Sequence, residues 1–118
     1  MERSIIVFAA LCLLAGCQAT PDTGTGRVTG DGVLDLPENK AYVACLKRKT
    51  DEYALLDGSP LELGTIAVSA CSSENFAFRQ ALIKSKGPGF ANAFMRLKAQ
   101  DDPKIVAEAI LYRRSRAR

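Results

Sequence analysis

The chain has 118 residues, of which 47% are hydrophobic and 25% are charged, and its formal net charge is +3 at pH 7. This length gives room for one domain of ordinary globular composition. The chain contains no His, which excludes Ser-His-Asp and Cys-His catalysis and zinc sites with His ligands. The small, dispersed net charge does not indicate a nucleic-acid-binding protein.

Residues 1–16 have the pattern of a signal peptide. A positively charged start precedes an apolar run from Ile5 to Leu14. A membrane-spanning helix needs about 20 apolar residues, so this run is too short to cross a bilayer. Its length suits the apolar region of a signal peptide.

The motif Leu14-Ala15-Gly16-Cys17 closes this run. It resembles the lipobox of bacterial lipoproteins, in which Leu, a small residue and Gly or Ala precede an acylated Cys. The resemblance implies removal of 1–16 and attachment of diacylglyceryl and N-acyl (palmitate-type) chains to Cys17. Each buried CH₂ contributes about 0.8 kcal/mol, so several chains hold a protein on a membrane.

Gln18 after the motif resembles the pattern that directs lipoproteins to the outer membrane. We therefore expect a protein of the cell envelope, anchored in the outer membrane and facing the periplasm. The alternatives are a plain secretory signal that is cut elsewhere, or a short buried helix.

Residues 17–36 are predicted to form a flexible linker. Thr, Asp, Pro and Gly dominate this segment, and no helical or strand period is visible. About 20 such residues have a root-mean-square span of about 25 Å, which would let the following domain stand clear of the lipid. The alternative is a short hairpin around residues 29–32, although an isolated hairpin is only marginally stable in water.

Residues 37–118 are predicted to form a helical domain. A first helix from Pro37 or Glu38 ends at Asp57-Gly58. Ser59-Pro60-Leu61-Glu62 forms a capping box that begins a second helix, which is expected to reach Lys86. The short connection makes these two helices an antiparallel hairpin.

The segment Gly87-Pro88-Gly89 ends the second helix. A third helical segment covers 90–99, and Asp102-Pro103 supplies the N-cap and first residue of a final helix. We accordingly interpret Asp101 and Asp102 as a helix cap rather than as a catalytic carboxylate pair. The predicted fold is all-α: a helix hairpin plus one or two C-terminal helices.

The cysteines predict one disulfide. Cys12 leaves with the signal peptide and Cys17 is acylated, which leaves Cys45 and Cys71. Each lies on the predicted buried stripe of its helix, about three turns from Gly58, so the two come level across the hairpin. In an oxidising compartment they should pair, and closing this loop contributes about 3.5 kcal/mol in the chain-entropy model.

No cofactor or metal is expected at these cysteines. Two thiols without His are too few ligands for a structural metal site. Redox-active pairs normally lie closer in sequence, as in Cys-x-x-Cys. A structural role is therefore favoured.

Two basic clusters stand out: Lys47-Arg48-Lys49 and a C-terminal tail that contains Arg113, Arg114, Arg116 and Arg118. The tail could bind anionic lipid headgroups or an acidic partner. The favoured alternative is that these cations complement the dipole of the last helix and extend into solvent. No aromatic residues are interleaved with them as nucleic-acid stacking would require.

Three functions remain open. The first is a non-enzymatic accessory of the envelope that contacts peptidoglycan, a secretion or conjugation assembly, or an outer-membrane protein. The second is a small periplasmic enzyme or enzyme inhibitor, with Glu74, Asp51 or Glu52 as candidate acids; these have ordinary helix-surface placements, so no catalytic residue is predicted. The third is binding of anionic surfaces through the Arg-rich tail.

Overall fold

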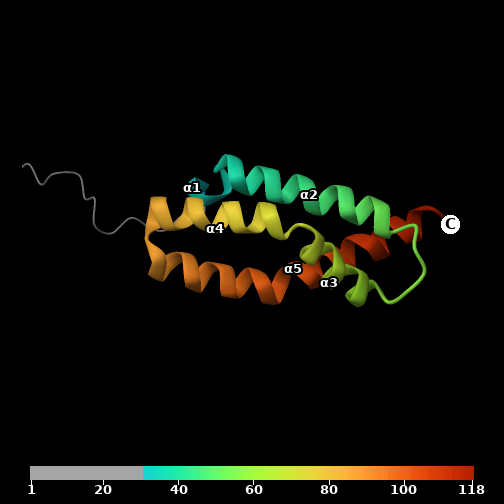
Figure 1. Ribbon diagram of the computed structural model, residues 1–118. Coiled ribbons are helices and arrows are strands. Elements are labelled where there is room, and N and C mark those ends of the chain that lie inside the picture. Colours follow the sequence, from blue (N-terminus) through green and yellow to red (C-terminus); the bar gives the residue numbers. More distant parts are fainter. Residues whose placement is uncertain (1–30) are drawn as a thin grey trace, which may run out of the picture.

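The structure, a computed structural model, describes residues 31–118; the predicted signal peptide, Cys17 and most of the predicted linker lie outside these residues. The described part is all-α and contains no strand, as predicted. Its five helices, shown in Figure 1, are α1 (Asp31–Leu34), α2 (Pro37–Tyr53), α3 (Pro60–Ala70), α4 (Ser72–Lys86) and α5 (Pro88–Arg116).

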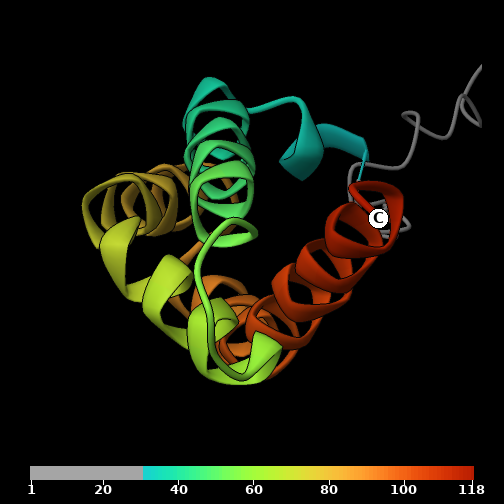
Figure 2. The same ribbon diagram turned by 90° about the vertical axis from the view of Figure 1, so that its right-hand side faces the viewer.

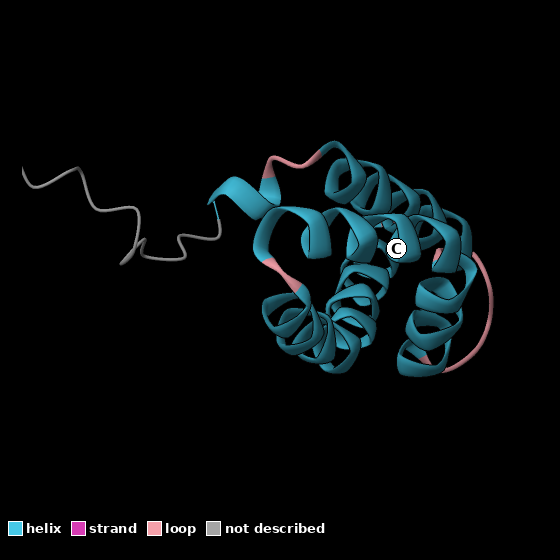
Figure 3. Cartoon of the chain, turned by 60° about the vertical axis from the view of Figure 1, so that its left-hand side comes forward, coloured by secondary structure: helices cyan, strands magenta, loops and turns pink. Residues whose placement is uncertain are grey.

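The long helix α5 organises the domain. Its first half runs antiparallel to α4 after a turn at Gly87, and its second half packs against α3 (Figures 1 and 2). Helix α2 packs mainly on α4 and contacts α3 and α5 less. In Figure 3 the loops are confined to short connections between these helices.

Two apolar clusters form the core. The first lies between α2, α4 and the start of α5, and its fully buried members include Tyr42, Phe78 and Leu82. Tyr42 and Phe78 stack with ring centroids 6.5 Å apart. The second joins α3 to the second half of α5 through Leu63, Ala67, Val106 and Ile110.

The predicted Cys45–Cys71 disulfide is present, with both residues buried and a Cα–Cα distance of 5.9 Å. It links α2 to the junction of α3 and α4. The helix hairpin that carries it is therefore confirmed, and the bond lies inside the first core cluster. In the chain-entropy model, closing a loop of this length contributes about 3.5 kcal/mol.

The predicted second helix, Pro60 to Lys86, is wrong as a single element. It divides at Cys71, whose φ of −100° and ψ of 23° separate α3 from α4. The bend lets α3 turn onto α5 while α4 stays against α2. A break of one residue does not interrupt the apolar spacing, so the sequence pattern did not reveal it.

The two predicted C-terminal segments are in fact one helix. α5 continues through Pro103, although a proline inside a helix costs about 3 kcal/mol. Asp102 is not an N-cap: it is buried, and its carboxylate accepts hydrogen bonds from the Tyr42 hydroxyl at 2.7 Å and the Lys98 ammonium at 3.3 Å. The tertiary contact from Tyr42, together with the packing of Gly64 against Pro103, stabilises the helix across the proline.

Two boundaries and one helix cap also differ from the prediction. The end of the expected linker contains α1, whose Val33 is fully buried in the first core cluster. Helix α2 ends at Tyr53, before Gly58, which has a φ of 133° in the following loop. Ser59 precedes α3, but its side chain makes no capping hydrogen bond.

Among residues 31–118, no helix combines the length and the apolar character that crossing a bilayer requires.

Candidate functional site

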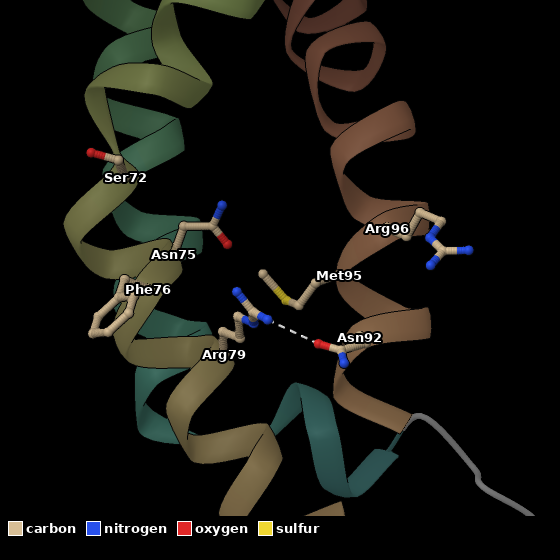
Figure 4. Close-up of a pocket in the computed structure, with 7 residues that line it drawn as sticks. All are labelled: Ser72, Asn75, Phe76, Arg79, Asn92, Met95 and Arg96. Carbon is tan, nitrogen blue, oxygen red and sulfur yellow. Dashed lines mark hydrogen bonds between the residues drawn. The ribbon is translucent and has the colours of Figure 1, made fainter. Parts of the chain in front are cut away.

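An open groove of about 600 Å³ lies between α4 and the first half of α5 (Figure 4). Its lining combines basic, amide and apolar side chains. They are Ser72, Asn75, Phe76, Arg79, Asn92, Met95 and Arg96.

Helical spacing explains why these residues share one groove. The four residues from α4 are spaced at i, i+3, i+4 and i+7, and the three from α5 at i, i+3 and i+4, so each set lies on one face of its helix. On α4 this face adjoins the one that carries Phe78 and Leu82 into the core. The groove therefore lies directly beside the first core cluster and has a fixed floor.

The groove is positively charged. Arg79 and Arg96 line it, and no carboxylate does. The Arg79 guanidinium donates a hydrogen bond of 2.9 Å to the Asn92 side-chain oxygen, which holds Arg79 across the groove. Neither arginine forms an ion pair with any other residue between 31 and 118. Both guanidinium charges are thus available to a ligand.

Asn75 supplies an unsatisfied polar group. Its side-chain oxygen Oδ1 is buried and has no hydrogen-bond partner in the described part of the chain. In Figure 4 its amide lies between the helices, facing Met95, whereas Phe76 and Arg96 lie at the outer edges of the groove. Leaving a buried acceptor without a partner costs about 1–3 kcal/mol. A ligand that donates a hydrogen bond here would recover that cost.

The Tyr42–Asp102–Lys98 cluster is a second concentration of polar groups. Burial, followed by the hydrogen bond to Asp102 and its negative charge, raises the pKa of the Tyr42 phenol above its usual value. The Lys98 ammonium lies 5.2 Å from the centroid of the Tyr42 ring. Because Tyr42 and Asp102 are buried, the cluster joins α2 to α5. Lys98 and Asp102 also line a hollow of about 320 Å³ between these helices.

Two of the four predicted tail cations contact the domain. Arg113 forms an ion pair with Asp51. Arg114 donates hydrogen bonds to the backbone carbonyls of Ala54, Leu56 and Gly58. These carbonyls belong to the end of α2 and the following loop. Arg114 therefore fastens this loop to α5, which is a structural role.

The other two tail cations make fewer contacts. The Arg116 guanidinium lies 4.8 Å from the centroid of the Tyr112 ring. Arg118 is exposed at the C-terminus. Cys17, the predicted lipidation site, lies outside the described residues.

The candidate acids are not brought together. Asp51 pairs with Arg113, and Glu52 accepts a hydrogen bond of 2.8 Å from Lys49. Glu74 lies on another helix, beside a shallow hollow between α2 and α4. Residues 31–118 contain no group of three or more Cys, Asp or Glu side chains placed to hold a metal ion.

Sequence reasoning missed the groove residues Asn75, Arg79, Asn92 and Arg96. Each looks in the sequence like part of a solvated helix face. The available signal was the set of helix positions 72, 75, 76 and 79, which share one face of α4 and include Arg79 but no acidic residue. Glu74, the acidic residue of this segment, lies off this face. That signal becomes informative only when α5 is placed opposite it.

Comparison of the chain with protein families, with curated proteins and with solved structures finds no match.

Proposed function

We propose that this protein is a lipid-anchored binding module of the bacterial cell envelope, and that it holds an anionic group of an envelope component in the α4–α5 groove. Acyl chains on Cys17 would attach it to the membrane, as the lipobox motif implies. The Cys45–Cys71 disulfide supports the location, because such bonds persist in oxidising compartments.

The observation that carries the binding proposal is the charge of the groove. Arg79 lies between the two helices and Arg96 at the outer edge of the groove, no carboxylate lines it, and neither guanidinium is neutralised by an ion pair within residues 31–118. Guanidinium groups that are left unpaired in a groove are well suited to bind carboxylate or phosphate.

The groove is favoured over the two alternatives. Asp51 and Glu52 are engaged in surface ion pairs, and Glu74 lies apart from both, so their positions give no support to catalysis. Arg113 and Arg114 are engaged with α2 and its loop, which leaves Arg116 and Arg118 for binding an anionic surface.

Site-specific photo-crosslinking in cells tests the proposal. A photoreactive residue replaces Phe76, which is 62% exposed at the edge of the groove, and in the control replaces Leu61 of α3, which is 53% exposed. The proposal predicts a discrete adduct at position 76 that disappears with Arg79→Gln and remains with Arg48→Gln. Identical adducts from positions 76 and 61, or an adduct that persists in Arg79→Gln, would contradict it.

A further inference from the structure

We infer that the ligand of the α4–α5 groove is a peptide that carries a carboxylate. This inference rests on the proposed function and adds the chemical class of the ligand. It follows from three features of the groove: the unpaired Arg79 cation, a buried acceptor without a partner, and the apolar side chains of Met95 and Phe76.

The Arg79 guanidinium favours a ligand with a carboxylate. A guanidinium has five N–H donors in a planar fork, and Arg79 uses one of its nitrogens on Asn92. Its remaining donors match the two oxygens of a carboxylate. Because Asn92 is neutral, the hydrogen bond positions Arg79 without cancelling its charge. Arg96 lies farther out, at the edge of the groove on α5.

The unpartnered acceptor requires a hydrogen-bond donor, which a peptide amide supplies. The Asn75 Oδ1 atom needs a donor, which a phosphate diester or a simple carboxylate does not provide. A peptide backbone has an N–H group a few ångströms from the carboxylate of an acidic residue. Asn75 and Arg79 are one turn apart on the same face of α4, so a single acidic residue can reach both.

The apolar side chains make room for the ligand. Met95 faces Asn75 in Figure 4 and its flexible thioether can move aside to uncover the buried oxygen. Phe76 offers an exposed ring at the groove edge on which an aliphatic stem can pack. A volume of about 600 Å³ lies within the range of small-ligand sites and fits a short peptide segment.

Calorimetric titration of the full chain, with its disulfide intact and in non-ionic detergent, tests the inference with four probes. Acetyl-Ala-Glu-Ala-amide has both features, and acetyl-Ala-Gln-Ala-amide has the N–H without the charge. Glutarate, used as its monomethyl ester, has the same single charge without the N–H, and inorganic phosphate is a simple anion. NMR amide shifts locate the bound probe. We expect the Glu peptide to bind with a Kd about tenfold lower than the Gln peptide.

The variants separate the two contacts. Arg79→Gln should raise the Kd of the Glu peptide about tenfold, and Arg48→Gln, which removes the same charge outside the groove, should not. Asn75→Ala should weaken the Glu peptide until it binds no better than glutarate, with glutarate itself unchanged.

The outcomes distinguish the inference from the proposed function. If glutarate or phosphate binds at the groove as tightly as the Glu peptide, the peptide inference is overturned and an anion-binding groove remains. If no probe shifts the amides of α4 and α5, both the inference and the proposed function are overturned.

Discussion

Gly64 of α3 lies directly against the backbone of Pro103 in α5. A Cβ atom on Gly64 would overlap the Pro103 carbonyl oxygen and come within 3.2 Å of the Ala107 backbone nitrogen. The absence of a side chain thus lets α3 approach α5 at the point where the proline interrupts the α5 hydrogen bonds.

Gly64→Ala should therefore destabilise the protein by about 1–3 kcal/mol, the usual cost of forcing atoms into a packed contact. This loss is expected even though Ala favours a helix by about 1 kcal/mol over Gly. Urea unfolding measures the effect. Gly89→Ala is the matched control, because nothing lies within 4 Å of the added Cβ, and it should be neutral or slightly stabilising. Equal stability of the two variants would contradict the close approach.

Tyr42→Phe should change how stability depends on pH. Tyr42 stays protonated in the folded state because burial and Asp102 raise its pKa, whereas in the unfolded chain it ionises near pH 10. The contribution of Tyr42 to the free energy of unfolding is therefore complete below about pH 10. As the pH rises further, this contribution falls by up to about 1.4 kcal/mol per pH unit. Unfolding of parent and variant between pH 8 and about pH 11.5 checks this. If the stability of the parent and of the variant depends on pH in the same way, the Tyr42 phenol is not buried as described.

Arg114→Met should loosen the loop that follows α2. The guanidinium is bonded to three carbonyls of this segment, including Gly58 at 3.1 Å, and Met keeps much of the aliphatic stem. We expect a loss of about 1–2 kcal/mol and faster amide exchange at residues 54–58. Arg118→Met, which removes the same charge from an exposed position, should leave both unchanged. If the two variants respond alike, Arg114 does not hold the loop and the tail is solvated.

Asn75→Ala should stabilise the unliganded protein by about 1 kcal/mol. The substitution removes a buried acceptor without a partner and inserts a better helix former. Gln80→Ala, at an exposed position of the same helix, changes helix propensity alone, so a larger rise in melting temperature for Asn75→Ala reports the removal of the unpartnered oxygen. If Asn75→Ala is the less stable variant, Oδ1 already has a partner in solution and no ligand is needed to satisfy it.

The disulfide and the helix content could be predicted because both depend on local spacing. Cys45 and Cys71 lie on apolar stripes at similar distances from Gly58, and this relation survives the bend at Cys71. The continuation of α5 through Pro103 could not be predicted, because local propensity favours a break there. The contacts that offset it come from Tyr42 and Gly64, which are 61 and 39 positions away.

The candidate groove was beyond sequence reasoning for a similar reason. Arg79 and Arg96 look like ordinary surface residues in the sequence. They line the same groove only because α4 and α5 lie antiparallel. The tail was conspicuous in the sequence, yet Arg113 and Arg114 bind the domain itself. Long-range neighbours decide in both cases whether a cation is available.

The envelope role depends on the proposed anchor at Cys17, and the intact mass of the chain extracted from bacterial membranes tests this anchor directly. We predict a mass that lacks residues 1–16 and carries the acyl groups, and a Cys17→Ala variant that keeps its leader and gains no lipid. A wild-type chain that is uncut, or cut but without fatty acids, would contradict the proposed attachment and with it the envelope role.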